Sequence, residues 1–392
     1  MQSLNATVSP ALQAVISQVI ETEGIAPRKL AEAVTELSRL FTKDRNRLSR
    51  SYLEDKTLRA AYLQYFMPVN LAKIQVLLKE MSVPQPETTL SVMDLGSGPG
   101  TGALAVLDWW HRLEMPHALS MITVDSSIPA LGQARELWDQ YCKAASVGEA
   151  SLRTYEGDLE QRAWVEHVRR GERFDLIILT NCLNEVYVDT KDPIAMRVDL
   201  VKEALSLLTL HGTIMVMEPA LRETSRGLHQ VRDRLLQEKH CSIYSPCLHE
   251  QSCPALVKPD DWCHEERAWE PHGIIQEIDE QVGFIKDALK FSYLLLRKDG
   301  KTIVQRRPDL YRVVSELREL KGEKRAWLCN EQGRQEVGRQ DRLASPHNEA
   351  FDQWHRGAIV QIEKIVRKER GGKVSVLGRI ERDAAVQIIR PV

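Results

Sequence analysis

The sequence predicts an α/β protein with a Rossmann-like central domain, an N-terminal helical region and a small β-rich C-terminal domain. Three observations support this fold class. Short apolar runs alternate with helical stretches through the middle of the chain, helical periodicity dominates the residues before them, and short β-branched runs follow them. With 392 residues, 43% of them hydrophobic, the chain is long enough for two or three domains with sizeable cores.

The N-terminal helical region is expected over residues 1–80. Apolar residues recur at helical spacing in ALQAVISQVI and LAEAVTELSRLF. Within FMPVN, Pro68 predicts a break, because proline donates no backbone hydrogen bond and its ring clashes with the preceding turn.

The Rossmann-like domain is expected over residues 81–300, with a cysteine-rich insertion at 241–273. Its candidate strands are the apolar runs LSVMDL, MITVD, LRTYEG, FDLIILT, TIMVME and FSYLLLR. Their alternation with helical stretches is typical of a doubly wound parallel sheet.

The C-terminal domain is expected over residues 301–392. Its runs GAIVQIEKIV, KVSVLGRIE and AAVQIIR predict a small barrel or sandwich. Residues 286–392 hold 24 Lys and Arg against 15 Asp and Glu, although the whole chain has a net charge of −2. This asymmetry favours a polyanionic partner for the basic end, and the alternative is a charged surface that only solvates the domain.

The composition argues against several classes of protein. No apolar run approaches the roughly 18 to 20 residues of a membrane-spanning helix, and the first 27 residues hold no Lys or Arg. We therefore expect a monomeric bacterial protein of the cytoplasm without a membrane partner. A mitochondrial matrix location is the alternative only if a transit peptide is missing from this sequence. In a reducing compartment, closely spaced cysteines are more often metal ligands or reactive groups than disulfides.

The strongest motif is VMDLGSGPGTGALAV, in which an apolar strand ends at Asp94, a glycine-rich loop follows and a helix begins near Ala103. Glycines allow a ligand to approach the backbone closely, and the helix presents its N-terminus to that ligand. A dinucleotide-binding G-x-G-x-x-G read from Gly96 would need glycine where Thr101 stands.

The glycine-rich loop is instead similar to motif I of class I S-adenosylmethionine methyltransferases. The resemblance implies that Asp94 lies near the methionine amino group of the cofactor. It also implies that the loop faces the ribose and methionine portion through Gly96, Ser97, Gly98 and Gly100.

Two further acids follow the next two predicted strands. Asp125 ends the second strand in ITVDSS, where a carboxylate can accept both ribose hydroxyls, and Asp158 in YEGDLE follows the third, where the methyltransferase resemblance places adenine. Because the carboxyl ends of parallel strands meet at one edge of a sheet, three acids there favour a ligand site over separate turn or cap roles. Ser126 and Asn181 complete the predicted cofactor-binding set.

The fourth predicted strand identifies no reaction. The run FDLIILTNCLNEVY lacks the Asn-Pro-Pro-Tyr or Asp-Pro-Pro-Tyr arrangement of enzymes that methylate exocyclic base amines, and the Pro-Cys pair of cytosine-C5 enzymes. Asn181, Asn184 and Glu185 are candidates to line a substrate pocket, whereas Cys182 is expected to be a buried thiol rather than a nucleophile. We therefore assign no catalytic residue.

Three clustered cysteines and one distant cysteine form a candidate metal site. Cys247, Cys253 and Cys263 have the spacing C-x5-C-x9-C, unlike the C-x2-C of zinc ribbons, and Cys329 follows 66 residues after Cys263. Four thiolates suit zinc or an iron-sulfur cluster, and the spacing alone does not choose between them. Cys241 is the alternative fourth ligand, and His249 and His264 are alternative nitrogen donors.

The run SPCLHEQSCPAL followed by DDWCHEE resembles the Cys-Pro-His, Cys-Pro-Leu and Asp-Trp-Cys-His signature of the methyltransferase-like proteins of the mitochondrial small ribosomal subunit and their bacterial relatives. The similarity extends to LRAAYLQYFMPVN, to the glycine-rich loop and to RGAIVQ, so it covers most of the chain from about residue 50. It implies a 4Fe-4S cluster of structural role on Cys247, Cys253, Cys263 and Cys329. The sequence departs from the signature at Leu248, in place of a proline, and at Glu265, in place of an aromatic residue.

The resemblance implies an S-adenosylmethionine-binding, methyltransferase-like protein that acts in small ribosomal subunit assembly or translation. Its expected partners are the small subunit or its precursor, and rRNA. The alternatives are a catalytically active RNA methyltransferase with a structural zinc site and an RNA-binding assembly factor without activity. Basic residues of the C-terminal end are expected to face the RNA, among them Arg306, Arg307, Arg367 and Lys368.

Overall fold

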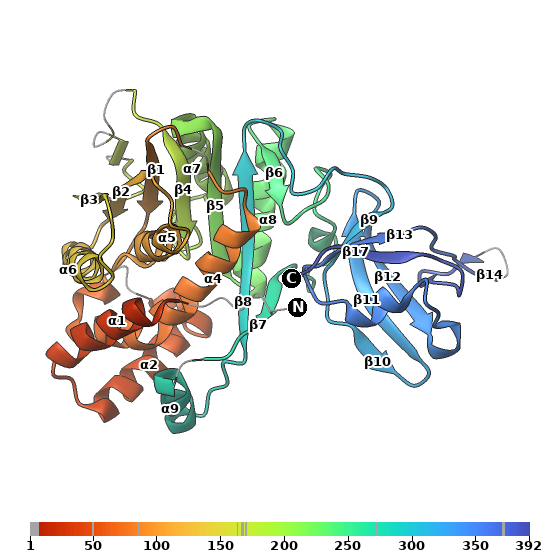
Figure 1. The fold of residues 1–392 in the computed structure, drawn as a ribbon, viewed down its shortest axis with the longest axis horizontal. Helices are drawn as coiled ribbons and strands as arrows, with labels where there is room; N and C mark the ends of the chain where they lie inside the picture. The colour runs from red at the N-terminus through yellow and green to blue at the C-terminus, as the bar shows by residue number, and fades with distance from the viewer. Residues whose placement is uncertain are drawn as a thin grey trace.

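The computed structural model describes residues 8–48, 51–84, 86–162, 164–165, 168, 171–271, 273–370 and 373–392. It has a helical region in red and orange, a central sheet flanked by helices, and a β-rich part in blue (Figure 1). The predicted fold class is therefore confirmed. Among the described residues, no helix is both long and apolar enough to cross a membrane.

The N-terminal region is helical throughout its described length. Its helices are α1 (Pro10–Thr22), α2 (Pro27–Thr42), α3 (Lys56–Ala61) and α4 (Met67–Glu80), with short 3-10 turns at Arg45–Arg47 and Tyr52–Glu54. Helix α1 begins at Pro10 because the Ser9 hydroxyl accepts the Leu12 N–H at 3.2 Å.

The predicted break at Pro68 is wrong, because the chain stays helical from α3 into α4. A π-helical turn, Tyr62–Phe66, precedes the proline, and the N–H of Met67 bonds to the carbonyl of Tyr62 five residues back. This wider turn places Pro68 at the start of α4, where its missing N–H costs little.

The central sheet contains the six predicted strands and two short ones that the sequence did not reveal. Its strands are β1 (Thr89–Leu95), β2 (Ala118–Asp125), β3 (Ala150–Glu156), β4 (Phe174–Thr180), β5 (Leu208–Pro219), β6 (Ser242–Ser245), β7 (Glu265–Ala268) and β8 (Ala288–Arg297). The strand order is β3-β2-β1-β4-β5-β8-β6, and β7 also pairs with β8. Strands β1 to β5 are parallel, and β8 is antiparallel to β5. The order reverses between β1 and β4, which is where open α/β sheets form a ligand crevice.

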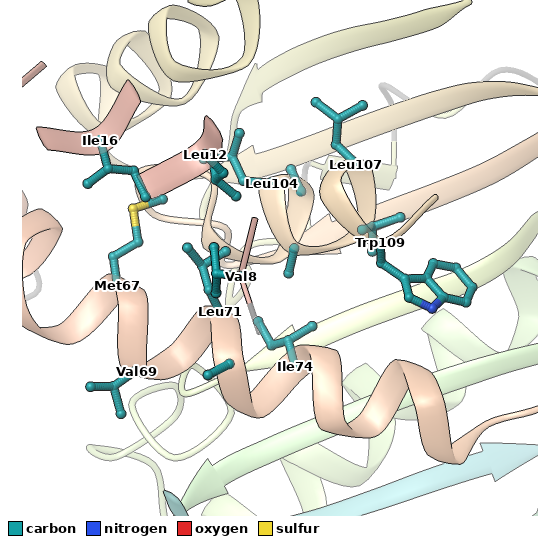
Figure 2. Packing of buried hydrophobic residues seen from close by; sticks show 14 of the residues in the cluster. Val8, Leu12, Ile16, Met67, Val69, Leu71, Ile74, Leu104, Leu107 and Trp109 are labelled. Atoms are coloured by element: carbon teal, nitrogen blue, oxygen red, sulfur yellow. The ribbon is translucent and has the colours of Figure 1, made fainter. Parts of the chain in front are cut away.

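Helices cover both faces of the sheet. They are α5 (Thr101–Arg112), α6 (Ile128–Ala144), α7 (Pro193–Leu207) and α8 (Arg222–Gln237), whereas α9 (Gly273–Val282) packs against α2 of the N-terminal region. Along β1, Val92 joins the core shared with the N-terminal helices, and Met93 joins the core against α7 and α8. Figure 2 shows Leu12 and Ile16 of α1 packed near Leu71 of α4 in the first core. The helical region is thus packed on the sheet.

The C-terminal part is a mostly antiparallel sheet with its own core. Its strands are β9 (Leu310–Val313), β10 (Arg318–Leu320), β11 (Glu323–Asn330), β12 (Gly333–Gln340), β13 (Ile359–Ile362), β14 (Glu369–Arg370), β15 (Lys373–Val374), β16 (Gly378–Arg379) and β17 (Val386–Arg390). The main order is β16-β12-β11-β9-β13-β17, and β14 pairs with β15 alone. Phe351 and Trp354, with ring centroids 4.5 Å apart, are buried in its core.

A buried ionic network joins the three parts. Arg312 of β9 lies 3.5 Å from Glu80 of α4 and 3.3 Å from Glu265 of β7, and it donates to the Tyr293 hydroxyl at 2.9 Å. Burial opposes ionisation of Glu80, but Arg312 and Arg267 together lower its pKa to about 2. Because each charge is paired, removal of one partner would leave another charge buried and unpaired.

Candidate functional site

A cavity of about 410 Å³ lies at the carboxyl ends of β1 to β4, where the strand order reverses. We call it the strand-end cavity. The sheet side of its lining comes from the loops after these strands, and the opposite side comes from the N-terminal helical region. The predicted cofactor residues that line it are Gly96, Ser97, Gly98, Asp125, Ser126, Asp158 and Asn181.

The glycine-rich loop needs its glycines for two reasons. Gly96, Gly98 and Gly100 have φ angles of 70°, 51° and 83°, in the left-handed region that side chains disfavour. A Cβ on Gly96 would also lie 2.6 Å from the Cβ of Cys182, a distance that no packed pair tolerates. The loop therefore approaches the loop after β4 closely and leaves its backbone open to the cavity.

Asp125 fixes the glycine-rich loop from the end of β2. Its carboxylate accepts the N–H of Gly98 at 2.7 Å and the N–H of Ser127 at 2.9 Å. Burial raises the pKa of Asp125, while these backbone donors lower it. Each oxygen keeps a further lone pair, so the carboxylate can still accept hydroxyl donors from a ligand.

Asp94 and Gly100, which the sequence assigns to the cofactor site, do not line the cavity. Asp94 is fully buried beneath the loop, and its Oδ2 accepts the N–H of Ala103 at 3.1 Å at the start of α5. Its Oδ1 has no hydrogen-bond partner among the described residues, and burial raises the pKa of Asp94 to about 7. Gly100 packs instead against Ala134 of α6, where an added Cβ would approach to 2.8 Å.

Asp158 and Asn181 occupy the loops after β3 and β4. Asp158 accepts the N–H of Glu160 at 2.8 Å and the side-chain amide of Gln161 at 3.1 Å. Asn181 has a left-handed backbone, with φ of 56°, and its N–H bonds to the Met217 carbonyl at 2.7 Å. These bonds orient both side chains at the cavity wall.

The wall formed by the N-terminal helices is aromatic, and the sequence analysis did not predict it. Phe41 meets Tyr52 and Phe66 edge to face, with centroids 5.4 and 5.1 Å apart, and Tyr62 stacks on Phe66 at 6.2 Å. All four rings line the strand-end cavity. Three of them fall between residues 52 and 66, so a density of aromatics before the first strand was the available signal.

The loop after β4 is polar and its charges are buried. Asn184 donates to the Glu218 carboxylate from both its backbone, at 3.3 Å, and its side chain, and Arg45 donates to the Asn184 side-chain oxygen. Burial, opposed by these bonds and reinforced by Glu185, raises the pKa of Glu218 to about 8. Glu185 lines the cavity, but Glu218 and Asn184 do not.

Cys182 behaves as the sequence predicts for a structural thiol. Its Sγ donates to the Leu95 carbonyl at 3.2 Å, and burial raises its pKa well above the usual value. A neutral thiol held in this way is a poor nucleophile.

The four predicted ligand cysteines come together at the contact between the central sheet and the C-terminal sheet. Burial, followed by the charges of Cys247, Cys263 and Cys253, raises the pKa of Cys329, so these sulfurs lie within electrostatic range of one another. Burial and Glu250 raise the pKa of Cys241 to about 12 with no contribution from another cysteine. The structure thus associates Cys329, rather than Cys241, with the three clustered cysteines.

The described residues nevertheless contain no group of three or more His, Cys, Asp or Glu side chains arranged to hold a single metal ion. The cysteines are all free thiols. The Sγ of Cys329 lies 3.7 Å from Nε2 of His249, and burial lowers the pKa of His249 to about 4, which leaves the imidazole neutral.

Helix α8 supports the cysteine-rich insertion with three side chains. Arg226 donates to the carbonyls of Ala255, Lys258 and Asp261, and Arg232, which is fully buried, donates to those of His249 and Gln251. His229 lies 3.0 Å from the carbonyl of Cys263. Since a loop without regular structure needs partners for its backbone, α8 decides where the cysteines lie.

The insertion contacts the wall of the strand-end cavity through Trp262. The indole N–H of Trp262 donates to the Ala220 carbonyl at 3.2 Å, and Ala220 lines the cavity.

The two residues of the insertion that depart from the family signature both contact the C-terminal sheet. Leu248 packs with Leu310 and Ile359 of the C-terminal sheet, and Glu265 pairs with Arg312.

Comparison with solved structures finds methyltransferases at low similarity. The methyltransferase CcbJ of Streptomyces caelestis is 18% identical over 38% of this chain and 48% of its own, with a TM-score of 0.27. Magnesium protoporphyrin IX methyltransferase of Synechocystis PCC 6803, solved with bound SAM, is 12% identical over 68% and 97%, with a TM-score of 0.32. The CurJ carbon methyltransferase is 16% identical over 73% and 70%, with a TM-score of 0.35. Similarity at this level carries no argument about substrate or activity.

No curated protein sequence matches this chain. A protein family, described as mitochondrial small ribosomal subunit Rsm22, matches residues 56–340. The match runs from α3 through the glycine-rich loop and the cysteine-rich insertion to the end of β12, and so includes Cys329. The chain therefore belongs to the Rsm22 family.

Proposed function

We propose that the strand-end cavity binds S-adenosylmethionine, and that this protein acts on or with the small ribosomal subunit through its RNA. The observation that carries the cofactor assignment is the convergence of the glycine-rich loop, Asp125 and Asp158 on one cavity at the strand-order reversal. The residues fit the cofactor. Asp94 keeps a buried oxygen without a described partner near the expected ammonium group, and Gly96 leaves the loop backbone bare.

Each residue has a distinct role in this proposal. The Asp125 carboxylate accepts the ribose hydroxyls while it holds the glycine-rich loop in place through Gly98. Asp158 and Leu159 border the adenine, and the aromatic wall keeps water away from the bound cofactor. When bound, the cofactor would supply an electrophilic methyl group.

The cofactor assignment is tested by calorimetry on the full chain. Asp125→Ala removes a charged acceptor of two ribose hydrogen bonds, each worth roughly 1.5 to 3 kcal/mol, so cofactor affinity should fall by at least about 150-fold. Asp139→Ala, which removes an exposed carboxylate on α6, is the matched control and should bind as the wild type does. Absence of heat with the wild-type protein would reject the assignment.

We further propose that Cys247, Cys253, Cys263 and Cys329 hold a 4Fe-4S cluster of structural role. The support is a set of four thiols within range of one another's charge, with Arg232 and Arg334 close enough to balance the negative charge of a thiolate-bound cluster. Burial and Cys247 raise the pKa of Cys263 to about 12, a cost that metal coordination would offset by binding the thiolate.

Metal analysis of anaerobically purified protein tests the cluster. The proposal expects brown protein with about four irons per chain. Cys329→Ser should abolish the iron, and Cys241→Ser, the matched control, should retain it. Colourless protein with one zinc per chain would favour the zinc alternative, and the reverse pattern of the two serine variants would identify Cys241 as the ligand.

Binding to the small subunit rests on the family and on the basic C-terminal end. The four basic residues named from the sequence are poor probes, because three of them are engaged. Arg306 lies 3.0 Å from Glu250, Arg307 lies 3.3 Å from Asp309, and Arg367 donates to the Ser375 carbonyl at 3.1 Å. Lys321, Lys364 and Lys368 are exposed and have no ion pair among the described residues, so they are the better probes.

Co-sedimentation with small subunits or their precursors over a salt series provides the test. The triple variant Lys321→Glu, Lys364→Glu and Lys368→Glu should bind more weakly. A plot of the logarithm of affinity against the logarithm of salt concentration should also be less steep, by about 0.9 for each phosphate that these lysines neutralise in the wild type. Lys29→Glu, Lys143→Glu and Lys191→Glu change the same charge elsewhere on the exposed surface, and this control should sediment as the wild type. Binding that ignores salt in all three proteins would reject an electrostatic contact.

An active RNA methyltransferase is the second candidate. It is favoured by the position of Asn181 and Glu185, two polar residues of the loop after β4 that line the strand-end cavity. Methyl transfer from labelled cofactor to RNA of immature small subunits, lost on Glu185→Gln, would establish it.

A further inference from the structure

Three lysines line one end of the strand-end cavity. Lys73 lies on α4, Lys286 lies just before β8, and Lys290 lies near the start of that strand. The start of β8 lies beside the end of β5, since Phe291 pairs with Pro219. This end is therefore on the far side of β4 and β5 from the loops after β2 and β3, where the adenosine is expected.

Two of these lysines lack a carboxylate partner among the described residues. Lys290 pairs with Glu266 at 2.8 Å. Lys73 donates only to the side-chain oxygen of Asn70, at 3.2 Å, and Lys286 lies 5.8 Å from the ring of Tyr65. Burial lowers the pKa of Lys286 and the Asp279 carboxylate opposes that shift, but this carboxylate accepts the Tyr65 hydroxyl and forms no ion pair with the lysine. No described carboxylate lies within ion-pair distance of Lys73 or Lys286.

A second cavity offers an instructive contrast. It occupies about 490 Å³ at the junction with the C-terminal sheet and shares Lys290 with the first. Three of its four arginines are paired with carboxylates, Arg312 and Arg267 with Glu80 and Arg356 with Glu316 at 3.4 Å. The fourth, Arg390, donates to the Glu80 carbonyl at 2.8 Å. The junction therefore holds buried carboxylates that offset most of its arginine charge, whereas Lys73 and Lys286 at the lysine end have no such ion-pair partner among the described residues.

At the lysine end of the cavity, the lysine charges repel one another when no anion is bound. Burial and the nearby Lys286 lower the pKa of Lys73 to about 7, and burial also lowers the pKa of Lys286. Like charges brought together in a partly desolvated site repel one another, and a bound anion would remove that penalty. An ammonium cluster suits a phosphate, which offers several acceptor oxygens and up to two negative charges.

We propose that Lys73 and Lys286, with Lys290 at the rim, bind a phosphate group of an RNA strand and so place a nucleotide beside the cofactor. The side chain of Lys290 is 54% exposed, so a polymer can continue out of the cavity at this point. The proposal rests on the proposed function, because it assigns the remainder of the cavity to S-adenosylmethionine.

Binding of inorganic phosphate, of a short single-stranded RNA and of S-adenosylhomocysteine to the full chain tests the proposal. The double variant Lys73→Met and Lys286→Met should lose at least tenfold in RNA affinity and keep S-adenosylhomocysteine affinity within about twofold. The matched control, Lys143→Met and Lys191→Met, removes two exposed lysines outside the cavity and should change neither value. Thermal melting of both variants checks that they fold, and the loss of a buried charge at Lys73 should not lower stability.

The outcomes separate the alternatives. If the lysine variant loses phosphate binding but binds RNA as the wild type does, the lysines form a phosphate site that does not serve RNA. That result would overturn the proposal that the phosphate belongs to an RNA strand. Loss of S-adenosylhomocysteine binding alone in the lysine variant would overturn the proposal, because the lysines would then serve the cofactor carboxylate. Failure of every protein, wild type included, to bind S-adenosylhomocysteine would reject the proposed function, and the RNA comparison would still decide the role of the lysines.

Discussion

The strand-end cavity and the cysteine-rich insertion differ in how far apart in the sequence the partners of their side chains lie. Asp125 is positioned by Ser127 and Asp158 by Glu160, each two residues away, and both lie at the ends of their own strands. Cys329 reaches the other cysteines from β11, in a different sheet, and the insertion is held by α8 and by Arg334, which bonds Asp261 at 2.7 Å across 73 residues.

This difference shows which site depends on the arrangement of the whole molecule. The sheet side of the cavity forms with the sheet itself, because its contacts lie within one loop or join the ends of neighbouring strands, as Gly98 and Asp125 do. The cysteine site requires the C-terminal sheet to dock against the central sheet, and docking relies on the buried network around Arg312. A change at the junction should therefore affect the two sites unequally.

The largest effect is expected from Arg312→Met. The substitution leaves the buried Glu80 and Glu265 with Arg267 as their remaining ion-pair partner, so one buried negative charge is uncompensated, which costs about 3 to 5 kcal/mol of stability. Since Arg312 pairs in register with Cys329, iron content should fall, while S-adenosylhomocysteine affinity should stay within about twofold. Denaturant unfolding, iron analysis and calorimetry measure these three quantities.

Arg307→Met is the control, because its ion pair with Asp309 is 46% exposed and should contribute less than about 1 kcal/mol. Equal losses of iron and cofactor affinity in Arg312→Met would show that the two sites depend on the junction to the same degree.

The converse experiment alters the cavity and spares the cysteines. Gly96→Ala adds a Cβ that would lie 2.6 Å from Cys182 in a left-handed backbone, so cofactor affinity should fall at least a hundredfold with no loss of iron. Gly98→Ala is the matched control, since its φ is also positive but the nearest atom, on Leu53, is 3.4 Å away. If both alanines weaken binding equally, backbone strain rather than the contact with Cys182 is responsible.

A pH titration should also act on the cavity alone. Burial raises the pKa of Asp94 to about 7, so the carboxylate is ionised above pH 7 and becomes protonated below it. Because an ionised carboxylate favours the cofactor ammonium, affinity should fall by up to tenfold per pH unit below 7, until the lower pKa of the cofactor complex is reached.

The linked effect on stability has the opposite direction. The unfolded state releases this proton near pH 3.9, so the free protein holds the extra proton between about pH 4 and 7 and should lose stability as pH rises through that range. Calorimetry from pH 5.5 to 8, in steps of about half a unit, measures the affinity, and Asp94→Asn should give a flat profile over the range set by this group. A tenfold change in Asp94→Asn as well would assign the pH dependence to another group.

The smallest effect is expected at the hydrogen bond between Trp262 of the insertion and Ala220 of the cavity wall. Trp262→Phe keeps an aromatic ring but loses the donor to the Ala220 carbonyl, a bond worth about 1 kcal/mol. Cofactor affinity should fall about two- to fivefold, and iron content should not change. An unchanged affinity would indicate that the insertion and the cavity are energetically independent.

The fold class, the six longer strands of the central sheet and the positions of Asp125 and Asp158 at the strand ends could be predicted from the amino-acid sequence. These features depend on periodicity and on residues that directly follow a strand, both of which are visible within a short segment. Asp94 and Gly100 lie beneath the lining rather than in it, because Asp94 bonds to the start of α5 and Gly100 packs against α6, and their predicted role toward the cofactor stays a prediction.

Contacts between side chains that are distant in the sequence became visible with the three-dimensional structure. It brought Cys329 to the clustered cysteines, placed the aromatic wall over the glycine-rich loop and showed that Arg306 and Arg367 are already engaged. It also gathered Lys73 and Lys286 from positions more than 200 residues apart. The residues of one segment determine its local hydrogen bonds and which of its faces is buried. The partners of that face in another layer depend on how the helices and sheets pack against one another, which the segment alone does not specify.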